Sequence, residues 1–292
     1  MTADPEALFD AVTGWYTGAA RDLPWRRPDA TPWAVLVSEV MLQQTPVARV
    51  LPAYQIWLTR WPTPSALAAD TPGHAVRAWD RLGYPRRALR LHAAALAMVE
   101  RHGGEVPSDY AELRALPGVG DYTAAAVAAF AFGRRHPVLD TNVRRVLARV
   151  VGGAASPAPS VSVAERSLAD SLLPDDGRLA ARLSVGLMEL GALVCAARDP
   201  KCETCPLTAT CAWRLAGAPA TAARRRAQRY EGTDRQARGR LLAVLRENDG
   251  PVPRQRLDAA WPDAIQRMRA LDGLVADGLV EPLARNRFRL PV

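Results

Sequence analysis

All four cysteines of the chain lie in one short segment, at Cys195, Cys202, Cys205 and Cys211. Cysteines that stabilise a framework through disulfide bonds are spread along a chain, whereas clustered thiolates converge on a metal. The C-x6-C-x2-C-x5-C spacing, interrupted by two prolines, therefore predicts a loop folded around a metal centre. Residue type and spacing alone favour a structural zinc ion, with an iron–sulfur centre as the alternative.

The charge balance predicts a polyanionic partner. The 292 residues include 38 Lys and Arg against 30 Asp and Glu, a formal net charge of +8. This excess indicates nucleic acid or an acidic membrane surface, and charge alone does not choose between them. The first residues are acidic where a signal peptide would be basic, and no apolar stretch of about 18 residues follows. With 49% apolar residues, we expect a folded protein in the cytoplasm.

The fold class is predicted from apolar residues that recur at helical spacing between about Asp4 and Arg149. Short Pro and Gly clusters interrupt this pattern, which suits brief connections between helices. No strand-like alternation competes with it there. A Gly/Ala/Ser/Pro loop at 151–162 precedes two more helical stretches, Val163 to Leu173 and Asp176 to Val194. The chain is therefore predicted to be mainly α.

The last quarter of the chain differs in composition. Residues 216–239 are predicted to be a basic linker, whose arginines are Arg224, Arg225, Arg226, Arg229, Arg235 and Arg238. The tail 240–292 predicts a helix from Arg240 to Glu247, a short helix near Arg254 to Ala260, a longer one around Asp263 to Ala276, and a small hairpin. This order of elements is that of a winged-helix-like module.

A tight turn with Pro117, Gly118 and Gly120 stands directly before a long Ala-rich helix. Its glycines let the backbone approach a ligand, and the following helix offers N–H groups to a phosphate. Most such turns only join two helices, however. Farther along the chain, Asp140 precedes another helical stretch, with Asn142 close by. Asp140 is either a helix N-cap or a functional carboxylate, and the pattern alone leaves both readings open.

Three motifs together resemble the helix-hairpin-helix DNA glycosylases of the endonuclease III superfamily: LPGVG (116–120), VLDTNVRRVLAR (138–149) and the four-cysteine segment. Within that superfamily, LPWRR (23–27), SEVMLQQTPV (38–47), RLGYPRRALRLH (81–92) and MELGALVC (188–195) are similar to the adenine DNA glycosylase, or MutY, family. The match extends from about Leu8 to Cys211 in the family's order.

The resemblance implies a role for individual residues. The expected catalytic residues are Glu39, Asp140, Tyr122 and Asn142. The residues expected to bind the flipped adenine are Trp25, Arg26, Leu42 and Glu189. Gln44 and Tyr84 are expected to fill the gap that the flipped base leaves, although Pro85 stands where the family often has a second aromatic residue. The expected phosphate contacts are Gly118, Gly120, Arg198 and Lys201.

The chemistry implied by the resemblance needs two carboxyl groups with different roles. Glu39, in an apolar helix that raises the pKa of a carboxyl group, would protonate adenine as it leaves. Asp140 would stay ionised and stabilise the oxocarbenium ion that develops on the sugar. Bifunctional relatives carry a lysine after the hairpin, which attacks the sugar and leads to strand cleavage. Tyr122 stands at that position, so we expect a monofunctional glycosylase without substantial lyase activity.

The resemblance also implies a [4Fe-4S] cluster on the four cysteines, in place of the zinc that spacing alone favours. It suggests an iron–sulfur-cluster domain of residues 1–30 and 135–215 and a six-helix domain of residues 31–134 that contains the hairpin. The linker 216–239 and the module 240–292 complete the chain.

The expected partner is double-stranded DNA with A:8-oxoguanine or A:G mispairs, bound by a monomer at the nucleoid and not at a membrane. Many family members read 8-oxoguanine with a Nudix-like C-terminal domain, but this tail is too short and too helical for one. Two alternatives are a G:T mismatch thymine DNA glycosylase and a noncatalytic iron–sulfur DNA-binding regulator. Arg26, Glu39 and Glu189 favour adenine over thymine, and the pair of Glu39 and Asp140 favours an enzyme over a regulator.

Overall fold

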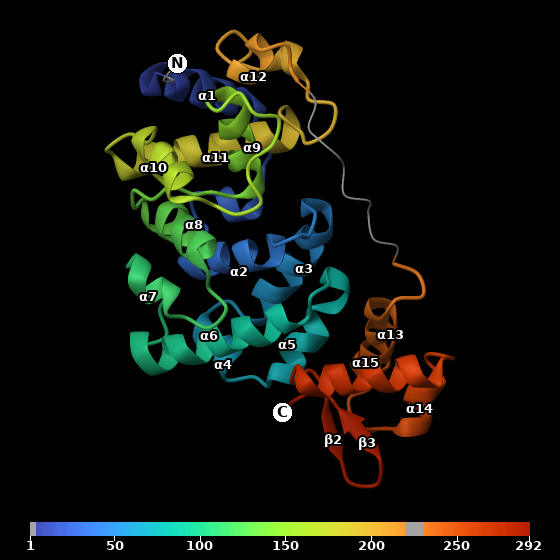
Figure 1. Cartoon of the computed structure of the whole chain (residues 1–292). Coiled ribbons are helices and arrows are strands. Elements are labelled where there is room, and N and C mark those ends of the chain that lie inside the picture. The colour runs from blue at the N-terminus through green and yellow to red at the C-terminus, as the bar shows by residue number, and fades with distance from the viewer. Residues whose placement is uncertain (1–3, 220–229) are drawn as a thin grey trace. The chain divides into compact units, whose positions relative to one another are not determined.

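The computed structural model describes residues 4–219 and 230–292 (Figure 1). These residues form two compact units, each built from separate stretches of the chain. The first unit contains 4–35, 108–114 and 120–219, and the second contains 36–107, 115–119 and 230–292. This grouping places the C-terminal tail in the second unit. The iron–sulfur-cluster domain and the six-helix domain inferred from the sequence remain a prediction. No helix in the described ranges is long and apolar enough to cross a membrane.

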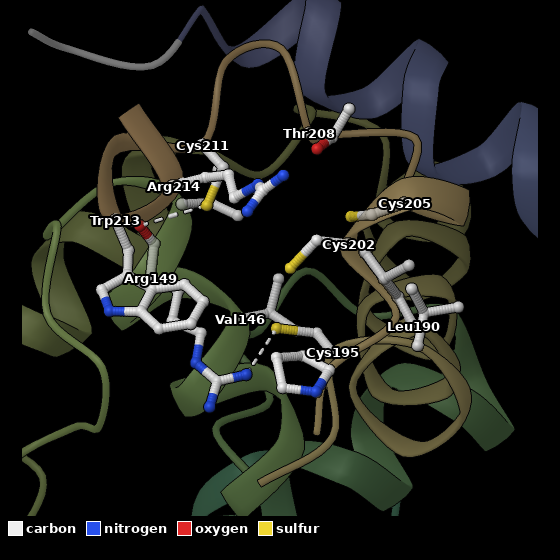
Figure 2. A pocket seen from close by; sticks show the side chains of 13 residues that line it. Val146, Arg149, Leu190, Cys195, Cys202, Cys205, Thr208, Cys211, Trp213 and Arg214 are labelled. Atoms are coloured by element: carbon white, nitrogen blue, oxygen red, sulfur yellow. Dashed lines mark hydrogen bonds between the residues drawn. The ribbon is translucent and has the colours of Figure 1, made fainter. Parts of the chain in front are cut away.

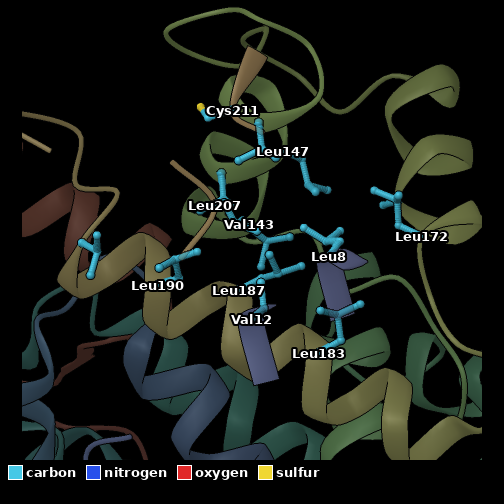
Figure 3. Packing of buried hydrophobic residues seen from close by; sticks show 14 of the residues in the cluster. Leu8, Val12, Val143, Leu147, Leu172, Leu183, Leu187, Leu190, Leu207 and Cys211 are labelled. Atoms are coloured by element: carbon cyan, nitrogen blue, oxygen red, sulfur yellow. The ribbon is translucent and has the colours of Figure 1, made fainter. Parts of the chain in front are cut away.

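The first unit is entirely helical in its described residues. Its elements are α1 (Pro5–Ala19), η1 (Pro24–Arg26), α7 (Tyr110–Arg114), α8 (Asp121–Phe132), α9 (Thr141–Val150), α10 (Val163–Ser171), α11 (Gly177–Leu193), η3 (Cys202–Thr204) and α12 (Ala212–Leu215). Its core lies between α1, α9 and α11, where Leu8, Val12, Val143, Leu183 and Leu187 pack together (Figure 3). The predicted helical stretches after residue 163 are confirmed.

The second unit combines short helices with a small sheet. Its elements are α3 (Val47–Arg60), α4 (Pro64–Ala68), α5 (Pro72–Ala78), η2 (Asp80–Leu82), α6 (Arg86–His102), α13 (Asp234–Arg246), β1 (Val252–Pro253), α14 (Arg254–Asp258), α15 (Ala264–Ala276), β2 (Glu281–Leu283) and β3 (Arg287–Arg289). Helix α2 (Pro32–Leu42) begins in the first unit and continues into the second. Thr63 and Thr71 cap α4 and α5, and each is followed by a proline whose fixed φ suits the first helical turn.

The C-terminal module, residues 230–292, has the predicted order of three helices and a hairpin. A short additional strand, β1, pairs antiparallel with β3, so the sheet order is β1-β3-β2. One boundary was predicted wrongly, because α13 begins at Asp234 rather than Arg240. The Thr233 hydroxyl accepts from the Gln236 amide and caps the helix, so the end of the predicted linker is helical. Arg224, Arg225, Arg226 and Arg229 lie outside the described residues.

One buried arginine joins two loops of the second unit. Six oxygen atoms surround the Arg87 guanidinium at 2.7–3.3 Å, namely the carbonyls of Val40, Met41, Gln43, Leu82 and Gly83 and the Thr45 hydroxyl. Burial lowers the pKa of Arg87 to about 10, so the group stays charged at neutral pH. The two loops that it connects carry Gln44 and Tyr84, the residues expected to enter DNA.

Replacing Arg87 with alanine is expected to destabilise the protein. The change leaves several buried carbonyl groups without donors, which should lower the free energy of unfolding by roughly 3 kcal/mol. Urea unfolding of wild type, Arg87→Ala and Arg87→Lys measures the effect. The lysine variant keeps the charge but lacks the planar set of donors that reaches both loops, so we expect an intermediate stability. An alanine variant as stable as wild type would show that the Arg87 hydrogen bonds do not hold the loops.

Candidate functional site

Asp140 caps α9 at the start of the segment expected to carry a catalytic carboxylate. Its Oδ1 accepts from the amides of Asn142 and Val143 at 2.9 and 2.6 Å, and its Oδ2 accepts from the Asn142 side-chain amide at 2.8 Å. The N-cap reading of Asp140 is thus confirmed. The cap also fixes the orientation of the carboxylate, so it is compatible with a catalytic role.

The electrostatic surroundings of Asp140 act in opposite directions. Burial disfavours the charged form, while the hydrogen bonds from Val143 and Asn142 and the charge of Arg145 favour it. Burial has the larger effect, and the pKa of Asp140 lies above its ordinary value. The hydrogen bonds from Asn142 are therefore needed to limit the rise.

Arg145 connects this carboxylate to the loop that carries the cysteines. Its guanidinium donates to Asn142 Oδ1 at 2.7 Å, to the Gly191 carbonyl at 2.6 Å and to the Cys195 carbonyl at 2.7 Å. Gly191 is required for this arrangement, because a Cβ there would lie 2.7 Å from the Cβ of Asn142. A continuous path of hydrogen bonds thus runs from Cys195 through Arg145 and Asn142 to Asp140.

Glu189 is fully buried and paired with two arginines. Arg21 donates to both of its oxygens at 2.6 and 2.7 Å, and Arg26 donates to Oε2 at 2.9 Å. The pKa of Glu189 lies below its ordinary value, since the arginine contacts together outweigh its burial, which is the largest single effect. The structure thus brings together the predicted residues Arg26 and Glu189. Arg21 carries no signal in the sequence, because only the fold reveals which arginine lies beside Glu189.

Glu39 lies on α2 and is only 4% exposed. Its neighbours along the helix, Val37, Val40 and Met41, are buried as well, so α2 is the buried, largely apolar helix that the sequence predicts. Glu39 belongs to the second unit and Asp140 to the first. Trp25 is buried in η1, and Leu42, the last residue of α2, is half-buried.

Gln44 and Tyr84 share an unusual backbone conformation. Their φ angles are +56° and +47°, in the left-handed region that residues other than glycine rarely adopt. Both side chains are exposed. Such strain persists only where the surroundings fix the backbone, and Arg87 holds the carbonyls next to both residues. Pro85, the departure from the family pattern, precedes α6 as its N-cap residue.

The glycine-rich turn before α8 requires one of its two glycines. Gly118 has a φ of +78°, and a Cβ there would lie 2.6 Å from the Cβ of Arg90. Gly120 has an extended backbone as the N-cap residue of α8 and is exposed, with nothing near the position of a Cβ. Tyr122, on the first turn of α8, is half-buried and packs in an apolar cluster with Tyr110 and Met188.

The four cysteines line one pocket of the first unit (Figure 2). All four are free thiols, and their sulfur atoms surround a shared space. Arg149 reaches Cys195 Sγ at 3.3 Å, and its guanidinium stacks on the ring of Trp213. In the described part of the chain, no three His, Cys, Asp or Glu side chains are close enough to hold a single metal ion. Arg198 and Lys201 are exposed on the same loop.

Burial disfavours thiolates in this pocket. It raises the pKa of Cys205 to about 11 and also raises that of Cys202. A group that binds there must therefore supply positive charge to hold the deprotonated sulfurs. Four soft thiolate donors around one space suit such a group.

Comparisons with known proteins agree on one family. A model of the HhH-GPD superfamily base excision DNA repair protein matches residues 37–170. The chain is 54% identical to an adenine DNA glycosylase of Mycolicibacterium smegmatis, over 99% of this chain and 97% of that protein. It is 40% identical to human adenine DNA glycosylase, over 72% of this chain and 40% of the human protein. It is 37% identical to the thymine/uracil-DNA glycosylase of Pyrobaculum aerophilum, over 68% of this chain and 87% of that protein.

Solved structures give the same assignment of the fold. A thermostable thymine-DNA glycosylase aligns with a TM-score of 0.66 at 28% identity, covering 73% of this chain and 97% of that structure. A trapped endonuclease III–DNA covalent intermediate aligns with a TM-score of 0.62 at 25% identity, with the same coverage. The resemblance found in the sequence is thereby confirmed: the chain belongs to the adenine DNA glycosylase family within the HhH-GPD superfamily of base excision repair proteins.

Proposed function

We propose that this DNA glycosylase hydrolyses the N-glycosidic bond of adenine mispaired with 8-oxoguanine or guanine. The observation that carries the proposal is the Asp140 carboxylate, which three donors hold in place and whose charged form they favour. A carboxylate held in this way suits the role of the anion. Glu39, a second carboxyl group buried on α2, can then take the role of the acid.

In the proposed reaction, Glu39 donates a proton to adenine as the bond to the sugar breaks. Asp140 stays ionised and stabilises the oxocarbenium ion until water attacks. Asn142 orients Asp140 through its side-chain amide. Tyr122 borders the sugar, and its position after the hairpin leaves no lysine there to form a Schiff base. The enzyme therefore releases the base without cutting the strand.

The remaining predicted residues have binding roles in this proposal. Trp25, Arg26 and Leu42 are each proposed to contact the flipped adenine, and Glu189 holds Arg26 in place. Gln44 and Tyr84 fill the space of the extruded base. Four residues contact phosphates, namely Gly118, Gly120, Arg198 and Lys201. The substrate, chromosomal DNA, places the enzyme at the nucleoid in the cytoplasm, and we expect it to act there as a monomer.

We also propose a [4Fe-4S] cluster on Cys195, Cys202, Cys205 and Cys211. The observation that supports it is that four soft sulfur donors surround one pocket, with the Arg149 guanidinium beside Cys195. A cluster bound there would supply structural support and positive charge. The four thiolates hold it, and the Arg149 side chain hydrogen bonds to one of them.

Base release from defined duplexes tests the reaction. Duplexes with adenine or thymine opposite 8-oxoguanine, guanine or cytosine are incubated with excess enzyme, and strands are examined with and without alkali. We expect adenine loss opposite 8-oxoguanine and guanine, with breaks only after alkali. Thymine loss opposite guanine would identify a thymine glycosylase instead, and release of neither base would favour the noncatalytic regulator. Breaks without alkali would contradict monofunctional chemistry.

The same assay tests the acid. Glu39→Gln keeps the shape of the side chain but removes its proton, so we expect base release to fall by at least about 100-fold while mismatch binding is retained. Glu100→Gln, on the exposed face of α6, is the matched control and should behave as wild type. Normal turnover by Glu39→Gln would mean that another group protonates the base.

The pH profile tests Asp140. Because Asp140 must be ionised and burial raises its pKa, the rate should fall on acidification at a pH above the usual range for aspartate. Asn142→Ala removes the side-chain amide that donates to Asp140 Oδ2 and favours the charged form, so this acidic limb should move to still higher pH. Thr141→Ala, an exposed change in the same helical turn, should leave the limb in place. Single-turnover rates measured between about pH 4 and 9 give the profiles. If the rate fell at the same pH in all three proteins, Asp140 would not be the group whose ionisation the reaction needs.

Metal analysis tests the cluster. Protein purified without oxygen should contain about four iron atoms and the visible absorbance of an iron–sulfur centre. Substituting serine for Cys202 should lower iron content and destabilise the first unit, while Ser184→Ala, away from the loop, should not. One zinc ion per chain, with no iron, would contradict the cluster and support the zinc site that spacing alone favours.

A further inference from the structure

The C-terminal module is fastened to the helices of its own unit by two arginines that exchange contacts. Arg77, on α5, donates to the carbonyls of Arg246 and Asn248 in the module. Arg246 donates in return to the carbonyls of Val76 and Asp80, at 3.0 and 2.6 Å. Backbone groups are rigid acceptors, so this reciprocal pair fixes α13 against α5 and η2.

Further contacts strengthen the attachment. Arg77 also forms an ion pair with Asp249 of the module at 3.1 Å. Asp277, at the end of α15, forms an ion pair with Arg86 on α6 and, within the module, another with Arg238 on α13. Gly73 lies so close to the end of the chain that a Cβ there would be 2.3 Å from the carbonyl oxygen of Pro291. The module is therefore packed onto the second unit as part of it.

A groove of about 1470 Å³ lies where the module meets the loops of Gln44 and Tyr84. Ten arginines and three carboxylates line it, which makes its charge strongly positive. Half of these arginines are exposed and form no ion pair with any carboxylate of the described residues: Arg49, Arg81, Arg90, Arg235 and Arg240. Exposed guanidinium groups gathered in one groove repel each other, so the groove is suited to a polyanion.

Arg235 marks the point where the groove meets the residues expected to enter DNA. Its guanidinium lies 5.3 Å from the centre of the Tyr84 ring and 5.6 Å from that of Tyr230. The two rings attract the cation and hold it in place while its side chain stays exposed, so it remains available to an anion. The module thus places positively charged side chains directly beside Tyr84.

We propose that this groove binds the sugar–phosphate backbone of the duplex beside the flipped adenine, and that Arg235 and Arg240 of the module contact its phosphates. The inference rests on the proposed glycosylase function. Arg235 and Arg240 both lie on α13 of the C-terminal module, so the module would add its own phosphate contacts to the DNA-binding surface.

Salt-dependent binding tests the proposal with the full-length protein. Each lost phosphate contact lowers the slope of log Kd against log salt by about 0.9, so Arg235→Ala/Arg240→Ala should lower it by about 2. At a fixed moderate salt concentration, Kd for a labelled duplex of normal base pairs should rise on the order of tenfold. Arg240→Ala alone, which leaves the contact between Arg235 and Tyr84 intact, should give about half of the slope change. Arg235→Lys/Arg240→Lys should restore most of the binding.

The matched control lies in the same module. Arg285→Ala/Arg287→Ala removes two exposed charges at the hairpin of β2 and β3, outside the groove, and should leave both Kd and slope unchanged. An equal loss in this control would assign DNA binding to the hairpin and overturn the proposal. Wild-type binding by Arg235→Ala/Arg240→Ala would overturn it as well, provided that thermal melting shows both variants folded.

The assay separates this inference from the proposed function. Binding to normal duplex needs no base release, so loss of binding in the groove variant would support the groove even if wild type released no adenine. Adenine release by wild type with no effect of the groove variant on Kd would keep the function and reject the groove.

Discussion

The structure depends on arginine side chains that donate hydrogen bonds to backbone carbonyl groups. A protein made of short helices leaves many carbonyls at helix ends and in loops without partners, and burial of such groups is costly. Arg87, Arg145 and Arg246 meet this need, each between segments that are distant in the sequence. A guanidinium group suits the task because its five donors are arranged in one plane. Many of the arginines that suggest a DNA-binding protein by their number therefore also hold the fold together.

The sequence predicted those features that have a local cause. Helical spacing predicted the helices. The N-cap of Asp140 was one of the two readings that the sequence left open, because capping depends on the next few residues. Arg21, Arg87 and Arg145 were not recognised as structural, because their partners are a distant carboxylate or backbone carbonyls that have no sequence signature. The start of α13 was missed for a related reason: residues 234–239 are polar and basic, and their helix packs through Ala237 alone in that stretch. The roles of Glu39, Asp140 and the cysteines came from resemblance, and their surroundings from the structure.

The cysteine loop and the carboxylate at Asp140 belong to one network. Cys195 lies at one end of a series of hydrogen bonds that passes through Arg145 and Asn142. A change in the conformation of the loop would move Arg145 and so alter the support for Asn142. In the proposed reaction, the cysteine loop can thus affect Asp140 through this network, in addition to the phosphate contacts proposed for Arg198 and Lys201. Gly191 keeps this connection short, because any larger residue would separate α11 from the start of α9.

The left-handed backbone at Gln44 and Tyr84 has a consequence for the insertion of these residues into DNA that we propose. A loop that reorganises on meeting DNA must lose conformational freedom during the encounter, and this loss weakens the complex. Here the unfavourable geometry is already established in the free protein, because folding of the unit fixes it. Gln44 and Tyr84 can then meet DNA without a change in their backbone. Most of the free energy of their contacts remains available for opening the base pair.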